Sequence, residues 1–172
     1  MALLVALGIM TAGCKQRQSP VTPQKSEQVR EDSTLMLPDF KMTLIGGSEM
    51  SARAEVAQHQ LTILDFWASW CGPCRAEMPL MVELYKDYHA KGLGIIGISL
   101  DEDEQAWKSA VNSMHMNWTQ VSDLNGWDNR AAQLFGIESI PYTIVVNRQG
   151  EILETGLRGE ALRDYVKRYI ND

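Results

Sequence analysis

Two cysteines separated by two residues are the part of this sequence best suited to chemistry. They stand in the segment Trp70-Cys71-Gly72-Pro73-Cys74. Two intervening residues let the sulfurs close a small ring without unfolding a helix, so the pair can cycle between a dithiol and a disulfide. The same spacing also occurs in zinc sites, but zinc needs two further Cys or His ligands at suitable spacing.

No further ligands for a metal are apparent in the sequence. The third cysteine, Cys14, lies far away in an unrelated segment, and the three histidines His59, His89 and His115 form no paired motif. The sequence therefore favours a redox dithiol over a metal site or a pair of inert cysteines.

A strand and a helix are expected to position the two sulfurs. Residues 61–67 are rich in β-branched and aromatic side chains and predict a buried strand. From Met78 onward, apolar residues recur at helical spacing. Cys71 should thus lie at the N-terminus of a helix, with Cys74 about one turn further in. The free amides and the helix dipole there should lower the pKa of the Cys71 thiol.

The segment from Asp65 to Cys74 resembles the active-site segment of the thioredoxin superfamily. The resemblance implies an α/β thioredoxin-like fold, with a central mixed β-sheet and helices on both faces. It also implies roles for individual residues. Cys71 would attack a target disulfide, and the more buried Cys74 would resolve the mixed disulfide. Asp65 would accept the Cys74 proton, and Trp70 would shield the sulfurs and contact the substrate.

A second informative stretch runs from Ile140 through Pro141 into a β-branched segment. In the thioredoxin superfamily the proline in this context follows a cis peptide bond and packs beside the sulfurs. The resemblance therefore implies that Pro141 supports the active site and that the backbone of Ile140 pairs with an extended substrate. The superfamily's buried acid is paired with a lysine on the next strand. Here that place falls near Gly97, which supplies no cation.

The remaining segments complete the expected fold. A hairpin is expected over 42–51, and the apolar run 94–100 indicates a strand buried on both faces. The acidic residues 101–104 are expected mainly as a solvated helix start, although Asp101 or Glu102 could stand near the active site. The further expected elements are a strand at 119–122, a helix at 128–135, an edge strand at 151–155 and a helix at 160–170. Within the superfamily the chain resembles the TlpA/ResA-like proteins, and the segment before the proline strand, including 121–128, resembles their extra insert.

The N-terminal segment is typical of an exported bacterial lipoprotein. Residues 1–13 are apolar and too short to span a membrane, which predicts a signal peptide. Cys14 would be lipidated, residues 14–34 would form a flexible tether, and residues 35–172 would form the thioredoxin-like domain. The alternative is an ordinary secretory signal cleaved nearby. Either signal implies export to the periplasm or cell envelope, and with the lipoprotein signal the lipid on Cys14 would be the membrane anchor.

The composition of the chain limits the kinds of partner that we expect it to bind. The net charge of −6 and the pI near 5.1 argue against a general nucleic-acid binder. No cofactor motif is present, so the Cys71–Cys74 pair itself would be the redox group. We expect a monomer that acts on exported proteins with disulfides, apocytochrome c being a candidate. A membrane donor of the DsbD/CcdA type would supply electrons.

The direction of electron flow and the reaction class leave alternatives open. Gly72 and Pro73 resemble the reducing members of the superfamily, which favours a disulfide reductase over a thiol oxidase or isomerase. Peroxiredoxins share the fold, but Ala68 occupies the place of their Thr or Ser. A Sco-type copper chaperone needs a longer cysteine spacing and a downstream histidine, and no histidine lies in 116–172.

Overall fold

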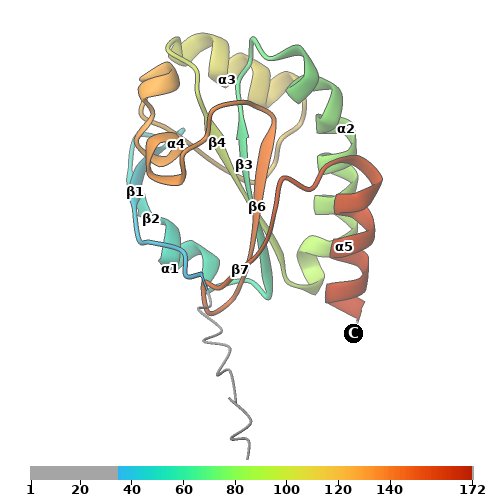
Figure 1. Cartoon of the computed structure of the whole chain (residues 1–172). Coiled ribbons are helices and arrows are strands. Elements are labelled where there is room, and N and C mark those ends of the chain that lie inside the picture. The colour runs from blue at the N-terminus through green and yellow to red at the C-terminus, as the bar shows by residue number, and fades with distance from the viewer. Residues whose placement is uncertain (1–34, 172) are drawn as a thin grey trace, which may run out of the picture. The chain divides into compact units, whose positions relative to one another are not determined.

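The protein folds around one seven-stranded mixed sheet. The computed structural model in Figure 1 describes residues 35–171. The strand order is β2-β1-β5-β4-β3-β6-β7. The strands are β1 Lys41–Leu44, β2 Glu49–Ser51, β3 Leu61–Trp67, β4 Leu93–Ser99, β5 Thr119–Ser122, β6 Tyr142–Asn147 and β7 Ile152–Thr155. The predicted signal peptide, the lipidation of Cys14 and the tether concern residues outside those described.

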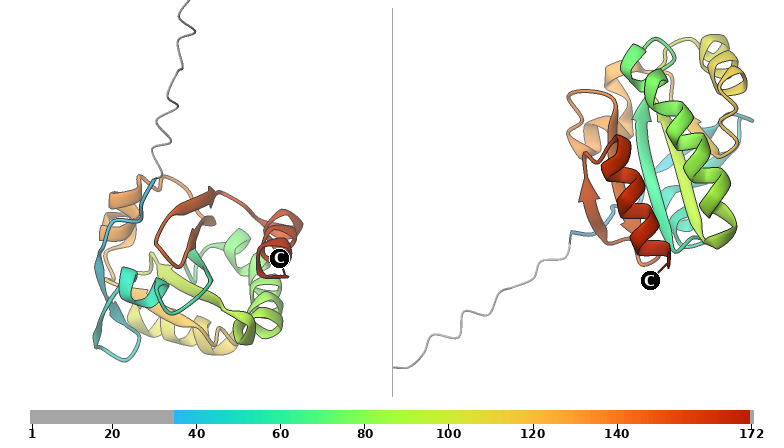
Figure 2. Two further views of the ribbon diagram at one scale, coloured as in Figure 1. Left: turned by 90° about the horizontal axis from the view of Figure 1, so that it is seen from below. Right: turned by 90° about the vertical axis from the view of Figure 1, so that its right-hand side faces the viewer.

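The helices cover both faces of this sheet, as predicted. They are α1 Ala52–Val56, α2 Gly72–Tyr88, α3 Glu104–Ser113, α4 Arg130–Phe135 and α5 Gly159–Asn171, with short 3-10 helices η1 His89–Lys91 and η2 Gly126–Asp128. Strands β3, β4 and β5 are parallel neighbours, joined in turn by α2 and α3. Right-handed crossovers in one direction place both helices on the same face. Helix α5 packs beside α2 on that face (Figure 2).

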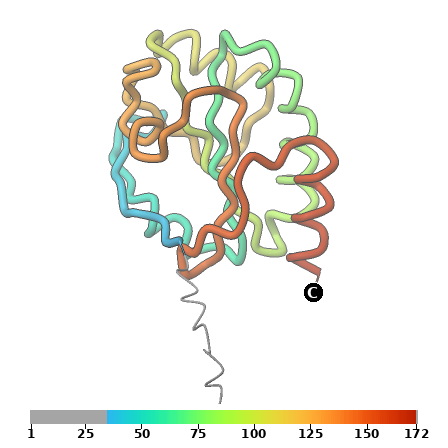
Figure 3. Tube along the Cα trace, in the orientation of Figure 1, coloured from blue at the N-terminus to red at the C-terminus, as the bar shows by residue number. Residues whose placement is uncertain are grey.

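Strands β3 and β4 lie at the centre of the sheet and support the segment that carries the cysteines. Every residue of β3 and β4 is buried, which confirms that these apolar runs are strands covered on both faces. Strand β6 lies antiparallel to β3, with Phe66 opposite Tyr142. The start of β6 therefore meets the end of β3, and the segments before Cys71 and before Tyr142 come to the same end of the sheet (Figure 3).

The predicted N-terminal hairpin is confirmed. Strands β1 and β2 pair in antiparallel fashion, and β1 also pairs with β5. Helix α1 follows directly because the Ser51 hydroxyl accepts a hydrogen bond from the Ala54 amide and caps it. The insert is thus tied to the hairpin through the β1–β5 pair.

The helix expected over 128–135 is shorter than predicted. It begins at Arg130, because the Asn129 side chain accepts hydrogen bonds from the amides of Ala131 and Ala132 and so forms the N-cap. Residues 126–128 form η2 instead. Helix α4 ends at Gly136, as predicted, where φ of +63° favours glycine. Among residues 35–171, no helix has the length and apolar character that a membrane span requires.

Candidate active site

The two cysteines form a disulfide at the start of α2. The S–S distance is 1.99 Å, and Cys71 is 5% exposed whereas Cys74 is fully buried. Cys71 is the N-cap of α2, and its Sγ accepts a hydrogen bond from the Cys74 amide at 3.2 Å. In the reduced protein, this amide and the helix dipole would stabilise a Cys71 thiolate. The burial difference makes Cys71 the sulfur that a substrate can reach first.

The residues between the cysteines form the first turn of the helix. Gly72 and Pro73 are the first two residues of α2. Pro73 is tolerated there because the first amides of a helix have no partner within the helix. The sulfurs are therefore held by a regular helix start rather than by a loose loop.

Asp65 is a buried carboxyl in the strand that leads to the cysteines. It is 3% exposed, and its Oδ2 has no hydrogen-bond partner among the described residues. Burial raises the pKa of Asp65 from 3.8 to about 7, and the negative charge of Glu77 adds to the shift. Such a group can accept or release a proton near neutral pH.

Glu77 was not singled out in the sequence, yet its charge influences Asp65. Its Oε2 accepts a hydrogen bond from the Gly159 amide at 3.1 Å. A usable signal exists in the sequence, since Glu77 follows Cys74 by three positions in the same helix. Residues at that spacing share a helix face.

The Ile140–Pro141 peptide bond is cis, as the resemblance implied. The pairing of Phe66 with Tyr142 brings this bond to the end of β3 that leads into Cys71. Ile140 is partly buried and precedes the strand, so its backbone takes no part in β6. This arrangement leaves the Ile140 backbone as a candidate pairing edge for an extended substrate.

Two exposed tryptophans lie in contact close to the reactive sulfur. Trp70 directly precedes Cys71 and is 56% exposed, and Trp127 from η2 is 43% exposed. Their ring centroids are 6.4 Å apart. Trp127 belongs to the insert, so sequence reasoning could not place it beside Trp70. Trp67, by contrast, is fully buried in the core.

A buried carboxylate fixes the loop that carries Cys71. Asp101 is 1% exposed and accepts hydrogen bonds from the Ser69 amide at 3.0 and 3.2 Å. It also accepts from the hydroxyls of Ser69 and Ser99. Asp101 thus lies near the active site, whereas Asp103 caps α3 and Glu102 is exposed. The expectation of a solvated helix start was wrong for Asp101.

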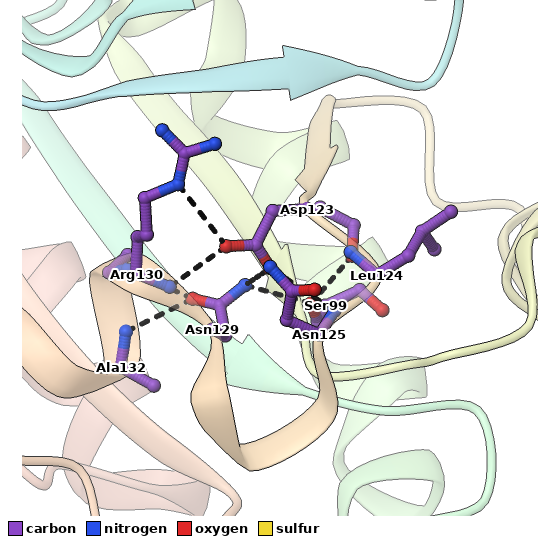
Figure 4. A network of polar contacts seen from close by, with 9 residues as sticks. Ser99, Asp123, Leu124, Asn125, Asn129, Arg130 and Ala132 are labelled. Carbon is purple, nitrogen blue, oxygen red and sulfur yellow. Dashed lines mark hydrogen bonds and ion pairs between the residues drawn. The ribbon is translucent and has the colours of Figure 1, made fainter.

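A second polar network attaches the insert to the same strand end (Figure 4). The Ser99 carbonyl accepts hydrogen bonds from the Ser122 hydroxyl at 2.9 Å and from the Asn129 amide group at 3.4 Å. Asp123 accepts from the Asn129 side chain at 2.8 Å and from the Arg130 backbone at 2.9 Å. Ser99 therefore links the insert on one side to Asp101 and the cysteine loop on the other.

Replacing Asp101 by alanine should destabilise the protein by about 2–3 kcal/mol, because the Ser69 amide and two hydroxyls would lose a buried acceptor. The neighbouring exposed Glu102 provides the control, and its alanine variant should stay within about 0.5 kcal/mol of wild type. Urea unfolding of both oxidised variants measures the difference. Equal losses in the two variants would contradict the role assigned to Asp101.

Within residues 35–171, no group of three His, Cys, Asp or Glu side chains is arranged to hold a metal ion. The redox-active group of the site is the cysteine pair.

Comparison with known proteins agrees with this chemistry. A family model described as thioredoxin-like matches residues 59–152. The thiol-disulfide oxidoreductase ResA of Oceanobacillus iheyensis is 31% identical over 78% of this chain and 69% of its own length. The ResA protein of Bacillus thuringiensis is 27% identical over 77% of this chain and 73% of its own length.

Solved structures show the same fold with similar identity. The C-terminal domain of a thiol-disulfide oxidoreductase from Bacteroides thetaiotaomicron superposes with a TM-score of 0.74 at 30% identity, over 80% of this chain and 95% of that one. A thiol-disulfide oxidoreductase from Bacteroides fragilis gives 0.72 at 32% identity, over 78% of this chain and 98% of that one.

Proposed function

Because the chain belongs to the thioredoxin-like family of thiol-disulfide oxidoreductases, we propose that it reduces disulfide bonds in proteins outside the cytoplasm. The observation that carries this proposal is the asymmetric burial of the two sulfurs at the start of α2. Cys71 is the N-cap of α2 and is slightly exposed, whereas Cys74 is fully buried. The Gly72-Pro73 pair supports the reducing direction.

The reaction begins with the reduced protein. The Cys71 thiolate attacks one sulfur of the substrate disulfide, forms a mixed disulfide and expels the second substrate sulfur as a thiolate, which takes a proton from solvent. Cys74 then loses its proton and attacks Cys71 Sγ. The Cys71–Cys74 disulfide forms, and the first substrate sulfur leaves as a thiolate that is protonated in turn. Two electrons pass from the protein to the substrate.

Asp65 provides the base for the second step. Cys74 is fully buried, so its proton has no direct exit to water. A carboxyl with a pKa of about 7 is partly ionised at neutral pH and can take that proton. It can release the proton again once the disulfide has formed.

Each turnover leaves the protein oxidised, so an external reductant must restore the dithiol. A membrane donor of the DsbD/CcdA type fits a domain tethered to the membrane through lipid on Cys14. Apocytochrome c is a candidate substrate because its cysteines must be reduced before haem attachment.

Labelling of cells with a radioactive fatty acid tests whether Cys14 carries a lipid anchor. Wild type should carry label, and Cys14→Ser should not.

The function itself is tested by mixing the reduced, desalted protein with insulin. We expect one insulin disulfide to be reduced for each Cys71–Cys74 pair oxidised, as followed by mass spectrometry of alkylated thiols. Retention of free thiols on the protein and intact insulin disulfides would contradict the proposal.

Substrate recognition is expected to involve Trp127 as well as Trp70. The Trp127→Ala variant should lose about tenfold in kcat/KM for insulin, because Trp is enriched among the few interface residues whose truncation costs more than about 1 kcal/mol. Its rate with glutathione disulfide should not change, since that molecule is too small to need both rings. Leu134→Ala is the control, because Leu134 is 50% exposed on α4. A similar loss in Leu134→Ala would contradict a specific contact.

A further inference from the structure

Asp65 lies in a row of three side-chain positions that crosses the centre of the sheet. Strand pairing places Asp65 beside Gly97 on β4, and Gly97 beside Gln120 on β5. Residues paired in this way point to the same face of a sheet. Gly97 has no side chain, so in this row no side chain stands between the Asp65 carboxyl and the Gln120 side chain.

The Gln120 side chain fills the space above Gly97. A Cβ added at Gly97 would lie 2.3 Å from Gln120 Oε1 and 2.7 Å from Nε2. The whole amide group therefore lies over Gly97, on the face of the sheet to which Asp65 also points. A side chain at position 97 would therefore require the Gln120 amide to move away from this place.

The hydrogen bonds already made fix the orientation of the amide. Trp67 Nε1, which can only donate, donates to Gln120 Oε1 at 3.3 Å. The Nε2 group of Gln120 therefore remains as a donor, and it is buried without a partner among the described residues. Asp65 Oδ2 is buried without a partner in the same row of the sheet. One is a free donor and the other a free acceptor.

No comparable donor reaches Asp65 from its other neighbour. Thr143 on β6 pairs with Asp65 in register, but its hydroxyl donates to the Leu157 carbonyl at 2.6 Å. The charged group acting on Asp65 from α2 is Glu77, an acid that can only disfavour the carboxylate. The cysteines at the head of α2 are joined in the disulfide and carry no charge.

We propose that the Gln120 side-chain amide is the hydrogen-bond donor of Asp65, reaching Oδ2 through one buried water that bridges the two unpartnered atoms. Gln120 is then a positioning residue that stabilises the Asp65 carboxylate without adding a charge beside it. It also connects that carboxylate to Trp67, which ends the strand leading to Cys71. The water-mediated link is inferred from the strand register and the two unpartnered atoms, whereas its part in deprotonating Cys74 rests on the proposed function.

The test is a carboxyl-carbon NMR titration of Asp65 in the oxidised protein. Gln120→Met keeps the side-chain length and removes the donor, so the Asp65 pKa should rise by about one unit, the scale of a hydrogen bond to a charged group. Thr62→Val is the matched control. It removes another buried, unpartnered polar atom of β3, at a position that points to the opposite face. That variant should leave the Asp65 pKa unchanged. An unchanged pKa in Gln120→Met would overturn the proposal.

Wild type provides a second readout that does not depend on how the variant folds. The Gln120 side-chain amide signals should shift with pH at the same midpoint as the Asp65 carboxyl carbon. The Gln133 amide, which donates to the Trp127 carbonyl at 2.8 Å, should not follow that midpoint. Gln120 signals that ignore the Asp65 titration would also overturn the proposal. Neither readout requires turnover, so failure here leaves the insulin experiment to judge the reductase function independently.

Discussion

Replacing Cys74 by serine is expected to trap the protein on its substrate, and replacing Cys71 by serine should abolish reduction altogether. Cys71 is the sulfur that a substrate can reach, so its loss removes the attacking group. Without Cys74 the mixed disulfide forms but has no internal thiol to resolve it. Non-reducing gel electrophoresis after mixing with insulin should show a covalent complex for Cys74→Ser alone.

A Cys14→Ser background is the appropriate control, because it leaves Cys71 and Cys74 as the only other cysteines of the chain. The covalent complex should also form in that background, and dithiothreitol should cleave it by reducing the mixed disulfide. A covalent complex formed by Cys71→Ser, but not by Cys74→Ser, would reverse the roles of the two sulfurs.

Asp65→Asn should make the oxidised protein more stable than wild type at alkaline pH, by about 4 kcal/mol at about pH 8. The Asp65 pKa is 3.8 in the unfolded chain and about 7 in the folded one. Between these values the folded protein binds more protons, so the stability of wild type falls as pH rises through that window. The gap of about three units corresponds to about 4 kcal/mol. Asparagine does not ionise, so the variant should lack this slope.

Urea unfolding from about pH 3 to about pH 8 measures this difference. Near pH 3 the carboxyl is neutral in both states, and the pH-dependent part of the difference should vanish. Asp39→Asn is a control of opposite sign. Hydrogen bonds from the Ser51 hydroxyl and the Arg53 amide lower the pKa of Asp39, so its stabilising contribution is lost as pH falls. Parallel stability curves for wild type and Asp65→Asn would contradict an ionisable buried carboxyl.

The parts of the site that sequence could predict are those encoded locally. The cysteine spacing, the strand before it and the helix after it lie within one continuous segment, and each follows from residue types and periodicity. The N-terminal hairpin is also encoded locally, whereas the cis Ile140–Pro141 bond was expected from the resemblance. The register that places Gly97 beside Asp65 was expected from the resemblance, and the pairing of β3 with β4 confirms it.

The parts that sequence missed depend on distant segments meeting. Asp101 or Glu102 was left open as a residue near the active site, but nothing in the order of the four acidic residues from Asp101 to Glu104 reveals that Asp101 is the one buried against Ser69. Gln120 is unremarkable in a strand until the absent side chain of Gly97 makes room for it. Trp127 reaches Trp70 only because the Ser99 and Asp123 networks attach the insert beside the active-site loop.

The reduction potential of the Cys71–Cys74 pair tests the reductase assignment most directly. The protein would be equilibrated with defined mixtures of glutathione or dithiothreitol and their disulfides, and the free thiols trapped by alkylation. A reductase requires a value near that of thioredoxin, about −270 mV. A value near about −120 mV, typical of a strong oxidant such as DsbA, would contradict the account and make the protein a donor of disulfides.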